Sequence, residues 1–277
     1  MNDIIEVIGK SLVQHGKNSD RVYLMKLCSE DYPCIINDIY NLAHEKSYSK
    51  IFIKVPGWAQ EGFESAGYTV EACIPHFYNG KQDGLFMALY LDPKRKEKSN
   101  AALIDEIISL AKNAAPLQAA PKRNQNYHLA NLGLEDAEDI SQIYKRVFET
   151  YPFPIHNPAY IKDTMNDNVV YFGIRDKGQL IAVSSSEMDI KSQNVEMTDF
   201  ATLPEYRSQG LASSLLYEME NAMRQRGIMT AYTIARAVSH GMNITFAKHN
   251  YIYSGTLINN TDISGEIESM NVWYKAL

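Results

Sequence analysis

The amino-acid sequence predicts an α/β protein with two domains. Its 277 residues exceed the about 100–200 residues of an ordinary domain. Apolar strands alternate with amphipathic helices along the C-terminal half, which is the order expected when helices flank a mixed sheet. A polar stretch from Pro116 through Pro121 to Asn126 separates the two halves. We therefore expect an N-terminal α/β domain with linker at residues 1–121 and a second domain at 122–277.

The upstream half ends in a strand–helix–hairpin unit followed by a helix. A strand is predicted at residues 50–55, then a helix that stops at Gly67, then strands at 70–78 and 85–91 around the Asn79-Gly80 turn. Residues 101–115 carry apolar side chains at helical spacing, so an amphipathic helix leads into the linker.

The downstream half alternates between strands and helices. Its hairpin turn, Asp176-Lys177-Gly178, separates two apolar runs, and Gly227 stops a long amphipathic helix. In chain order, the predicted elements are a strand at 127–132, a helix at 135–150, strands at 169–175, 180–186 and 195–203, a helix from about 211 to 226, a strand at 230–235, a helix at 239–249, and strands at 251–258 and 268–274.

The tails of the two halves have the same order of elements. Gly67 and Asn250 occupy equivalent places, where a helix usually ends in the left-handed conformation. We therefore expect the N-terminal domain to be a degenerate copy of the C-terminal fold. The alternative is that two unrelated strand–helix–hairpin units, which are common, occur in the same chain.

Composition argues against several classes of function. A formal net charge of −6 disfavours nucleic-acid binding, and we interpret the basic run Lys94-Arg95-Lys96 as a solvated strand end. No stretch approaches about 18 uninterrupted apolar residues, which disfavours a membrane protein. The three cysteines and the scattered histidines lack ligand spacing, so we expect no metal and reduced thiols in a cytoplasmic protein.

The segment from Thr198 to Ala212 joins a predicted strand to a predicted helix and has the features of an anion site. Pro204 ends strand pairing because it has no N–H to donate. Gly210 and Ala212 allow a ligand to approach the backbone closely, and the unpaired amides of the new helix attract an anion. Arg207 adds a positive charge suited to a phosphate. Together these features favour a pyrophosphate.

The bare pattern Arg/Gln-x-x-Gly-x-Gly/Ala is weak, because average composition predicts a chance match in roughly one chain in four of this length. The strand before it and the amphipathic helix after it make it more specific. In this context residues 127–277 resemble the GNAT acetyltransferase superfamily, which implies a mixed sheet flanked by helices and acetyl-CoA as the cosubstrate. A helix start with small residues for packing is the alternative.

The superfamily resemblance implies a set of cofactor contacts. The backbone of Phe200, Ala201 and Thr202 is expected to pair with the pantetheine arm of coenzyme A. Asn243 is a candidate to hydrogen-bond the same arm, with surface solvation as the alternative. The residues expected around the pyrophosphate are Arg207, Ser208, Gln209, Gly210, Leu211 and Ala212.

A closer resemblance spans both halves. The stretches 71–80, 241–248, 259–265 and 268–275 look like those of beta-lysine N6-acetyltransferases. This resemblance implies acetyl transfer to the terminal amine of beta-lysine, which gives N6-acetyl-beta-lysine, a compatible solute, and a lysine 2,3-aminomutase as pathway neighbour. The acceptor could instead be a polyamine, an alpha-amino acid or an aminoglycoside, and a non-catalytic acyl-CoA sensor is a further alternative. A homodimer is one option for its assembly.

Acetyl transfer requires a proton acceptor, because an amine with a pKa near ~10.4 is almost wholly protonated at pH 7. Glu196 and Asp199, on the strand that leads into the motif, are the first candidates for this general base. Glu187, on the strand before it, is the third. The alternative for each is a solvated or hairpin-edge carboxylate.

The leaving thiolate of coenzyme A often receives a proton from a Tyr in this superfamily. The aligned residue here is Phe246, which cannot donate. Tyr251 is our candidate acid, with Tyr253 nearby. Alternatively the thiolate, with a pKa near ~8.5, leaves unprotonated.

A pocket for beta-lysine also needs donors for the carboxylate and acceptors for the second amine. The candidates near the predicted terminal strands are Arg236, Asn259, Asn260, Glu268 and Asn271. Turn formation is the alternative role for the asparagines. His76 and Tyr78 are candidates to close the pocket from the upstream half, with interface packing as their alternative.

Overall fold

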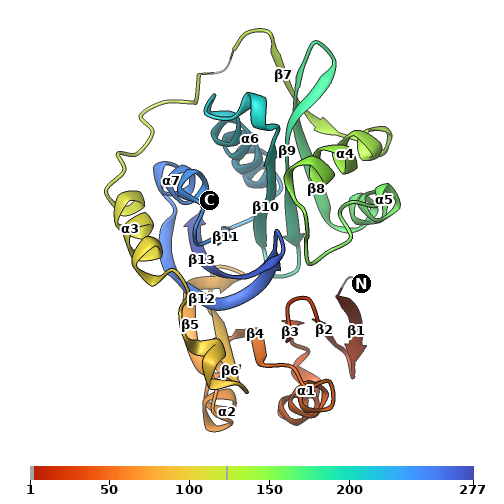
Figure 1. The fold of residues 1–277 in the computed structure, drawn as a ribbon, viewed down its shortest axis with the longest axis vertical. Helices are drawn as coiled ribbons and strands as arrows, with labels where there is room; N and C mark the ends of the chain where they lie inside the picture. Colours follow the sequence, from red (N-terminus) through yellow and green to blue (C-terminus); the bar gives the residue numbers. More distant parts are fainter. Residues whose placement is uncertain (1–2, 123) are drawn as a thin grey trace.

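The computed structural model describes residues 3–122 and 124–277 of the chain. Over these residues the strands form one 13-stranded mixed sheet in the order β1-β2-β3-β4-β6-β5-β12-β13-β11-β10-β9-β8-β7. The N-terminal strands lie at the bottom of Figure 1 and the C-terminal strands above them. The predicted α/β fold class, with a large mixed sheet flanked by helices, is confirmed.

The C-terminal half contributes the larger part of the sheet. Its strands are β7 (Tyr127–Leu132), β8 (Val169–Asp176), β9 (Gln179–Asp189), β10 (Asn194–Thr202), β11 (Thr230–Arg236), β12 (Ile252–Ile263) and β13 (Glu266–Ala276). Its helices are α4 (Ala137–Val147), α5 (Pro158–Asp167), α6 (Leu211–Gln225) and α7 (His240–Lys248). Because β9 is buried without interruption from Leu180 to Ser186, both faces of the sheet are covered here.

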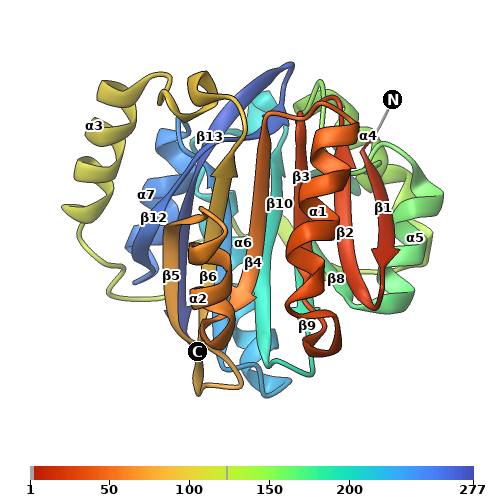
Figure 2. The ribbon, with the colours of Figure 1, turned by 90° about the horizontal axis from the view of Figure 1, so that it is seen from below.

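The N-terminal half is a smaller sheet with its own helices. Its elements are β1 (Ile4–Ile8), β2 (Ser11–Gly16), β3 (Arg21–Lys26), α1 (Cys34–Glu45), β4 (Lys50–Pro56), α2 (Gln60–Ser65), β5 (Thr69–Tyr78) and β6 (Gln82–Tyr90), followed by the 3₁₀ turn η3 (Pro93–Lys96) and helix α3 (Ala101–Lys112). Helix α3 packs against α7 of the other half, as Figures 1 and 2 both show.

The two halves repeat one strand topology. The N-terminal order β2-β3-β4-β6-β5 corresponds to β9-β10-β11-β13-β12, and the parallel pairs β3–β4 and β10–β11 occupy equivalent places. Helix α2 is followed by Gly67 at φ +92° and helix α7 by Asn250 at φ +64°, so both ends are left-handed as predicted. The descent of the upstream half from a copy of the downstream half stays a prediction.

The seam between the halves is the pairing of β5 with β12, where Gly255 lies opposite Ala72. A Cβ atom at Gly255 would lie 2.0 Å from the carbonyl oxygen of Glu71, so only glycine permits this close approach. A shared apolar core, which includes Phe77 and Phe86 from one half and Tyr232 from the other, lies at this junction. The two halves therefore pack as one body, although the linker we predicted runs between them.

The sequence located the downstream elements well and the first 49 residues poorly. Strand β7 has the predicted bounds, and most other predicted elements agree within about two residues. Strands β1 to β3 and helices α1 and α5 had no predicted counterpart. The interpretation of Lys94-Arg95-Lys96 as a solvated strand end was wrong, because these residues form the turn η3 and Arg95 is buried.

Three cysteines are free thiols in this structure, namely Cys28, Cys34 and Cys73. Across residues 3–122 and 124–277, helices long and apolar enough to span a membrane are absent. Within the same ranges, no group of three His, Cys, Asp or Glu side chains is arranged to hold a metal ion.

Candidate active site

The site begins where two central strands separate. Parallel pairing between β10 and β11 covers only residues 194–196 of β10, after which the strands diverge. The register of β10 against β9 shifts between Thr198 and Ala201, and Asp199 in this bulge has φ +55°. The bulge turns β10 away from β11 and aims the side chain of Asp199 into the opening.

The edge of β10 that faces this opening lacks a strand partner beyond Glu196 within the described residues. On its other edge, Ala201 and Thr202 pair with β9. The backbone of residues 200–202, which the sequence suggested as the pantetheine contact, therefore has one edge available for an extended ligand.

The loop after β10 leads directly into helix α6. Gly210 precedes the helix at φ +72°, and no side chain caps the first turn, so its backbone amides are left for an anion. Arg207 is exposed on this loop, and Gln209 accepts a hydrogen bond of 2.8 Å from the Tyr127 hydroxyl. A Cβ atom at Gly210 would contact no protein atom within 4 Å, so the space beside it is open.

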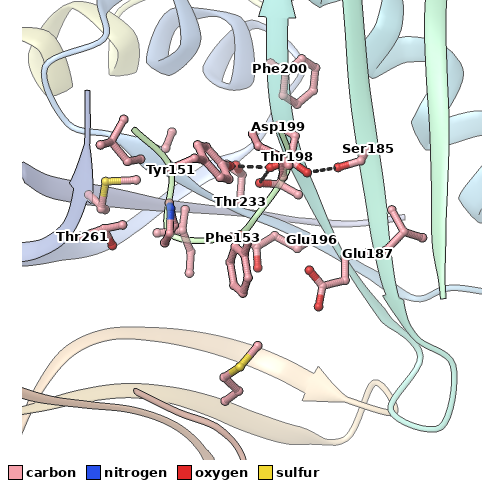
Figure 3. Close-up of a pocket in the computed structure, with 18 of the residues that line it drawn as sticks. Tyr151, Phe153, Ser185, Glu187, Glu196, Thr198, Asp199, Phe200, Thr233 and Thr261 are labelled. Carbon is pink, nitrogen blue, oxygen red and sulfur yellow. Dashed lines mark hydrogen bonds between the residues drawn. The ribbon is translucent and has the colours of Figure 1, made fainter. Parts of the chain in front are cut away.

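A cavity of about 340 Å³ connects the strand opening to the N-terminal half. Phe200 and Phe246 line it near the opening, and Arg21, Phe52 and Lys54 line it from the N-terminal strands β3 and β4. Figure 3 shows the carboxylates of this cavity on the C-terminal strands, above the strands of the other half. The cavity is therefore built jointly by both halves.

Asp199 is held by three hydroxyl groups inside this cavity. The Tyr151 hydroxyl donates to Oδ1, Ser185 Oγ donates to Oδ2 at 2.5 Å, and Thr198 Oγ1 lies 3.4 Å from Oδ1 (Figure 3). Burial raises the pKa of Asp199, while these hydrogen bonds act in the opposite direction. Because both carboxylate oxygens already accept hydrogen bonds, Asp199 is better suited to orient neighbouring groups than to take a proton.

Glu187 and Glu196 are direct register partners on β9 and β10, and their side chains point into the same space (Figure 3). Burial, together with the charge of Glu187, raises the pKa of Glu196 to about 7. The ammonium of Lys54 and the hydroxyl of Tyr232 oppose this shift. A carboxyl group with a pKa near neutral has the proton affinity that a general base requires.

Lys54 belongs to the N-terminal half but acts on this carboxylate pair. Its Nζ donates a hydrogen bond of 2.9 Å to the Tyr232 hydroxyl. Burial disfavours its charge, yet Tyr23, Tyr232 and Glu196 together raise its pKa well above the ordinary value. Desolvation by the surrounding protein also raises the pKa of Glu187, although part of this residue remains exposed.

Three candidate residues are engaged in structural hydrogen bonds outside the cavity lining. Asn243 donates to the carbonyls of Arg236 and Ser239 and accepts from Asn271 and Trp273, so its amide is fully used. Asn271 is fully buried in the same network. The third, Asn259, donates to carbonyl oxygens of the segment that includes η3.

Tyr251 lies behind Phe246, with ring centroids 5.0 Å apart, and does not line the cavity. Its hydroxyl is buried without a hydrogen-bond partner among the described residues. Phe246 itself lines the cavity and packs edge-to-face against Phe200. A direct path for a proton from Tyr251 to a ligand in the cavity is thus blocked by the phenyl ring.

Two other candidates, Arg236 and Asn260, do line the cavity. Arg236 donates from Nε to Oε2 of Glu268 at 2.8 Å, and a second hydrogen bond joins Nη2 to Oε1. Arg236 and Glu268 therefore form a forked ion pair. Asn260 is 1% exposed, and its Oδ1 has no hydrogen-bond partner among the described residues. Asn260 therefore offers an unused acceptor to a ligand.

Sequence reasoning missed the contribution of β3 and β4. Arg21, Tyr23 and Met25 alternate along β3 and face the cavity together, as do Phe52 and Lys54 on β4. The signal was available: charged residues stand at inward positions of otherwise apolar strands. His76 and Tyr78, which we considered instead, are outside the cavity lining.

Comparisons with known proteins give a family match and several relatives. Residues 137–249 match the model of the Acetyltransferase (GNAT) family. The chain is 44% identical over 275 residues to a beta-lysine N(6)-acetyltransferase of Methanococcus maripaludis, covering 99% of each chain. It is 34% identical to the N-acetyltransferase YodP of Bacillus subtilis, over 87% of this chain and 86% of that protein. A beta-lysine N(6)-acetyltransferase of Methanosarcina mazei is 29% identical, over 85% and 94% respectively.

Proposed function

Since the chain belongs to the GNAT acetyltransferase family, we propose that it transfers an acetyl group from acetyl-CoA to the N6 amine of beta-lysine. The observation that carries this proposal is the joint cavity, which contains Glu196 and adjoins the open edge of β10. The uncapped start of α6 follows that strand along the chain. Such a cavity suits a small acceptor that brings an ammonium group to a carboxylate.

The cofactor contacts follow from the loop and the strand edge. The first amides of α6 and the guanidinium of Arg207 bind the pyrophosphate, because both supply positive charge beside open space. The free edge of residues 200–202 holds the pantetheine arm in an extended form. Together these contacts direct the thioester toward the point where β10 and β11 separate.

Glu196 acts as the general base in this proposal. Its ionised carboxylate takes a proton from the N6 ammonium, and the neutral nitrogen then attacks the acetyl carbonyl carbon. The carbon–sulfur bond breaks, and coenzyme A leaves as a thiolate, whose ordinary pKa near ~8.5 makes a protein acid dispensable. The nitrogen then loses its second proton. Glu196 returns its proton to solvent and the thiolate takes up one proton there, so the products are the amide, the thiol form of coenzyme A and one proton in solution.

Some of the remaining candidates for acceptor contacts line the cavity, and others stabilise the terminal strands. Asn260 and Arg236 line the cavity and can contact an acceptor, whereas Glu268 holds the guanidinium of Arg236. Asn259 and Asn271 hold β12 and β13 in place through their side-chain amides. We also propose that the product serves as a compatible solute and that a lysine 2,3-aminomutase supplies the substrate.

An acceptor panel tests the proposed function. Thiol release with acetyl-CoA is measured for beta-lysine, alpha-lysine and cadaverine, and mass spectrometry locates the acetyl group. We expect kcat/KM for beta-lysine to exceed that for cadaverine by at least ~10²-fold, because cadaverine leaves polar groups of the pocket unpaired. Equal rates for the three amines would contradict the assigned acceptor, and absence of thiol release with every amine would favour the acyl-CoA sensor.

A further inference from the structure

Arg21 on β3 is a buried cation that lines the cavity from the N-terminal half. Its side chain is 4% exposed. Nη1 donates to the Asn260 carbonyl at 2.6 Å and to Thr261 Oγ1 at 2.9 Å, while Nη2 makes one long contact of 3.4 Å with Gln14 Oε1. Nε has no acceptor among the described residues. The edge formed by Nε and Nη2 is therefore largely unused.

The charge of Arg21 also has no carboxylate in direct contact among the described residues. No carboxylate oxygen of the described residues lies within 4.0 Å of its guanidinium, although Asp3 acts on it from farther away. Burial lowers the pKa of Arg21 to about 10, so the group stays protonated at neutral pH. A buried charge without an ion-pair partner in contact is costly, and an anionic ligand that contacts it reduces that cost.

The groups around Arg21 suit the carboxylate and the adjacent ammonium of an amino acid. Asn260, whose carbonyl oxygen Arg21 binds, also presents the unpartnered buried acceptor Oδ1. A cation and an acceptor side by side match a carboxylate and a nearby ammonium. Glu187 and Glu196 supply the negative charge elsewhere in the same cavity.

We propose that Arg21 binds the carboxylate of the acceptor through Nε and Nη2, with Asn260 Oδ1 accepting from its 3-ammonium group. This assignment rests on the proposed function and gives the N-terminal half a direct part in substrate recognition. The C-terminal half, which carries the cofactor loop, supplies the general base. The N-terminal half binds the carboxylate of the acceptor.

The test compares beta-lysine with 1,4-diaminopentane, which is beta-lysine without its carboxylate. Arg21→Gln should lower kcat/KM for beta-lysine by ~10²-fold and change that for 1,4-diaminopentane by less than about threefold. The preference of the parent for beta-lysine should therefore nearly vanish in the variant. Isothermal titration with acetyl-CoA should give the same Kd for both proteins.

Arg95→Gln is the matched control, because Arg95 is also buried and also binds a carbonyl of β12, that of Asn259, but does not line the cavity. It should lower the melting temperature while keeping the parent's acceptor preference. If Arg21→Gln does not fold, Arg21→Lys keeps the charge without the fork and should lose roughly tenfold with beta-lysine alone.

Equal losses with both amines, in Arg21→Gln or in Arg21→Lys, would show a purely structural role and overturn the assignment. A parent enzyme that prefers 1,4-diaminopentane would overturn the assignment together with the proposed acceptor. A parent that prefers beta-lysine and a variant that keeps this preference would leave the proposed function intact and refute Arg21 alone.

Discussion

Glu196→Gln tests the proposed base, since an amide cannot take a proton from an ammonium group near neutral pH. With a pKa of about 7, about one tenth of Glu196 is ionised at pH 6 and about nine tenths at pH 8. The kcat/KM of the parent for beta-lysine should therefore rise about tenfold over this interval. It should then stay level until the amine itself loses its proton near ~10.4.

In the variant only the rare neutral amine in solution reacts. Its kcat/KM should rise about tenfold for every pH unit, without a break near pH 7, and thus about 100-fold from pH 6 to pH 8. At pH 7 the parent should be faster by ~10²- to 10⁴-fold. Thiol release at low beta-lysine concentration, measured from pH 6 to 9.5, gives both profiles.

Glu187→Gln is the control for this experiment. Its side chain lies opposite Glu196, and its charge is one of the causes that raise the pKa of Glu196. The break in its profile should move below pH 7, by less than about one unit because Glu187 is exposed. A Glu196→Gln profile that keeps the parent's break would refute the assignment of the base and return the role to Asp199 or water.

Three further predictions follow from the geometry. Lys54→Met should move the break in the parent's profile above pH 7, since the Lys54 ammonium lowers the pKa of Glu196; an unchanged break would contradict this coupling. Gly210→Asp should abolish acetyl-CoA binding, measured by calorimetry, because the new carboxylate repels the pyrophosphate. Gly210→Ala must adopt the same φ of +72° but adds no charge, so it should retain most of the affinity. Asn243→Ala should lower the free energy of unfolding in urea by about 3 kcal/mol, because Trp273 Nε1 and Asn271 lose a buried acceptor. A lost affinity for acetyl-CoA without a lost stability would instead restore Asn243 to the pantetheine site.

The sequence predicted most elements whose apolar pattern is regular, and two of the strands that it missed carry buried polar groups. Strands β2 and β3 contain Gln14, His15 and Arg21, all buried, which interrupt the alternation that marks a strand. Arg21 and Arg95 each donate to a carbonyl of β12, more than 160 positions away along the chain. No local pattern indicates such a partner, so Arg95 was interpreted as solvated and Arg21 was not identified as a candidate.

The same limit applied within the site. The loop from Arg207 to Gly210 and the carboxylates of β9 and β10 could be identified, because they adjoin one motif in the sequence. The place of Lys54 on an apolar strand was a local signal, but its link to Tyr232 exists only once the two halves have packed. The candidate asparagines were recognised as polar residues of the terminal strands, but the sequence could not separate Asn260, at the cavity, from Asn271, inside the core.

The seam at Gly255 makes the unit of folding larger than the region that the family model matches. The family match ends at residue 249, before the strand that joins the halves. A fragment cut at residue 122 would open the edge of β12 and uncover Tyr232, Leu257 and Met270, which are 2%, 0% and 4% exposed in the whole chain. A bare strand edge beside apolar side chains invites self-association. Any design that transfers this activity to another protein must therefore include both halves, because neither half is an independent unit.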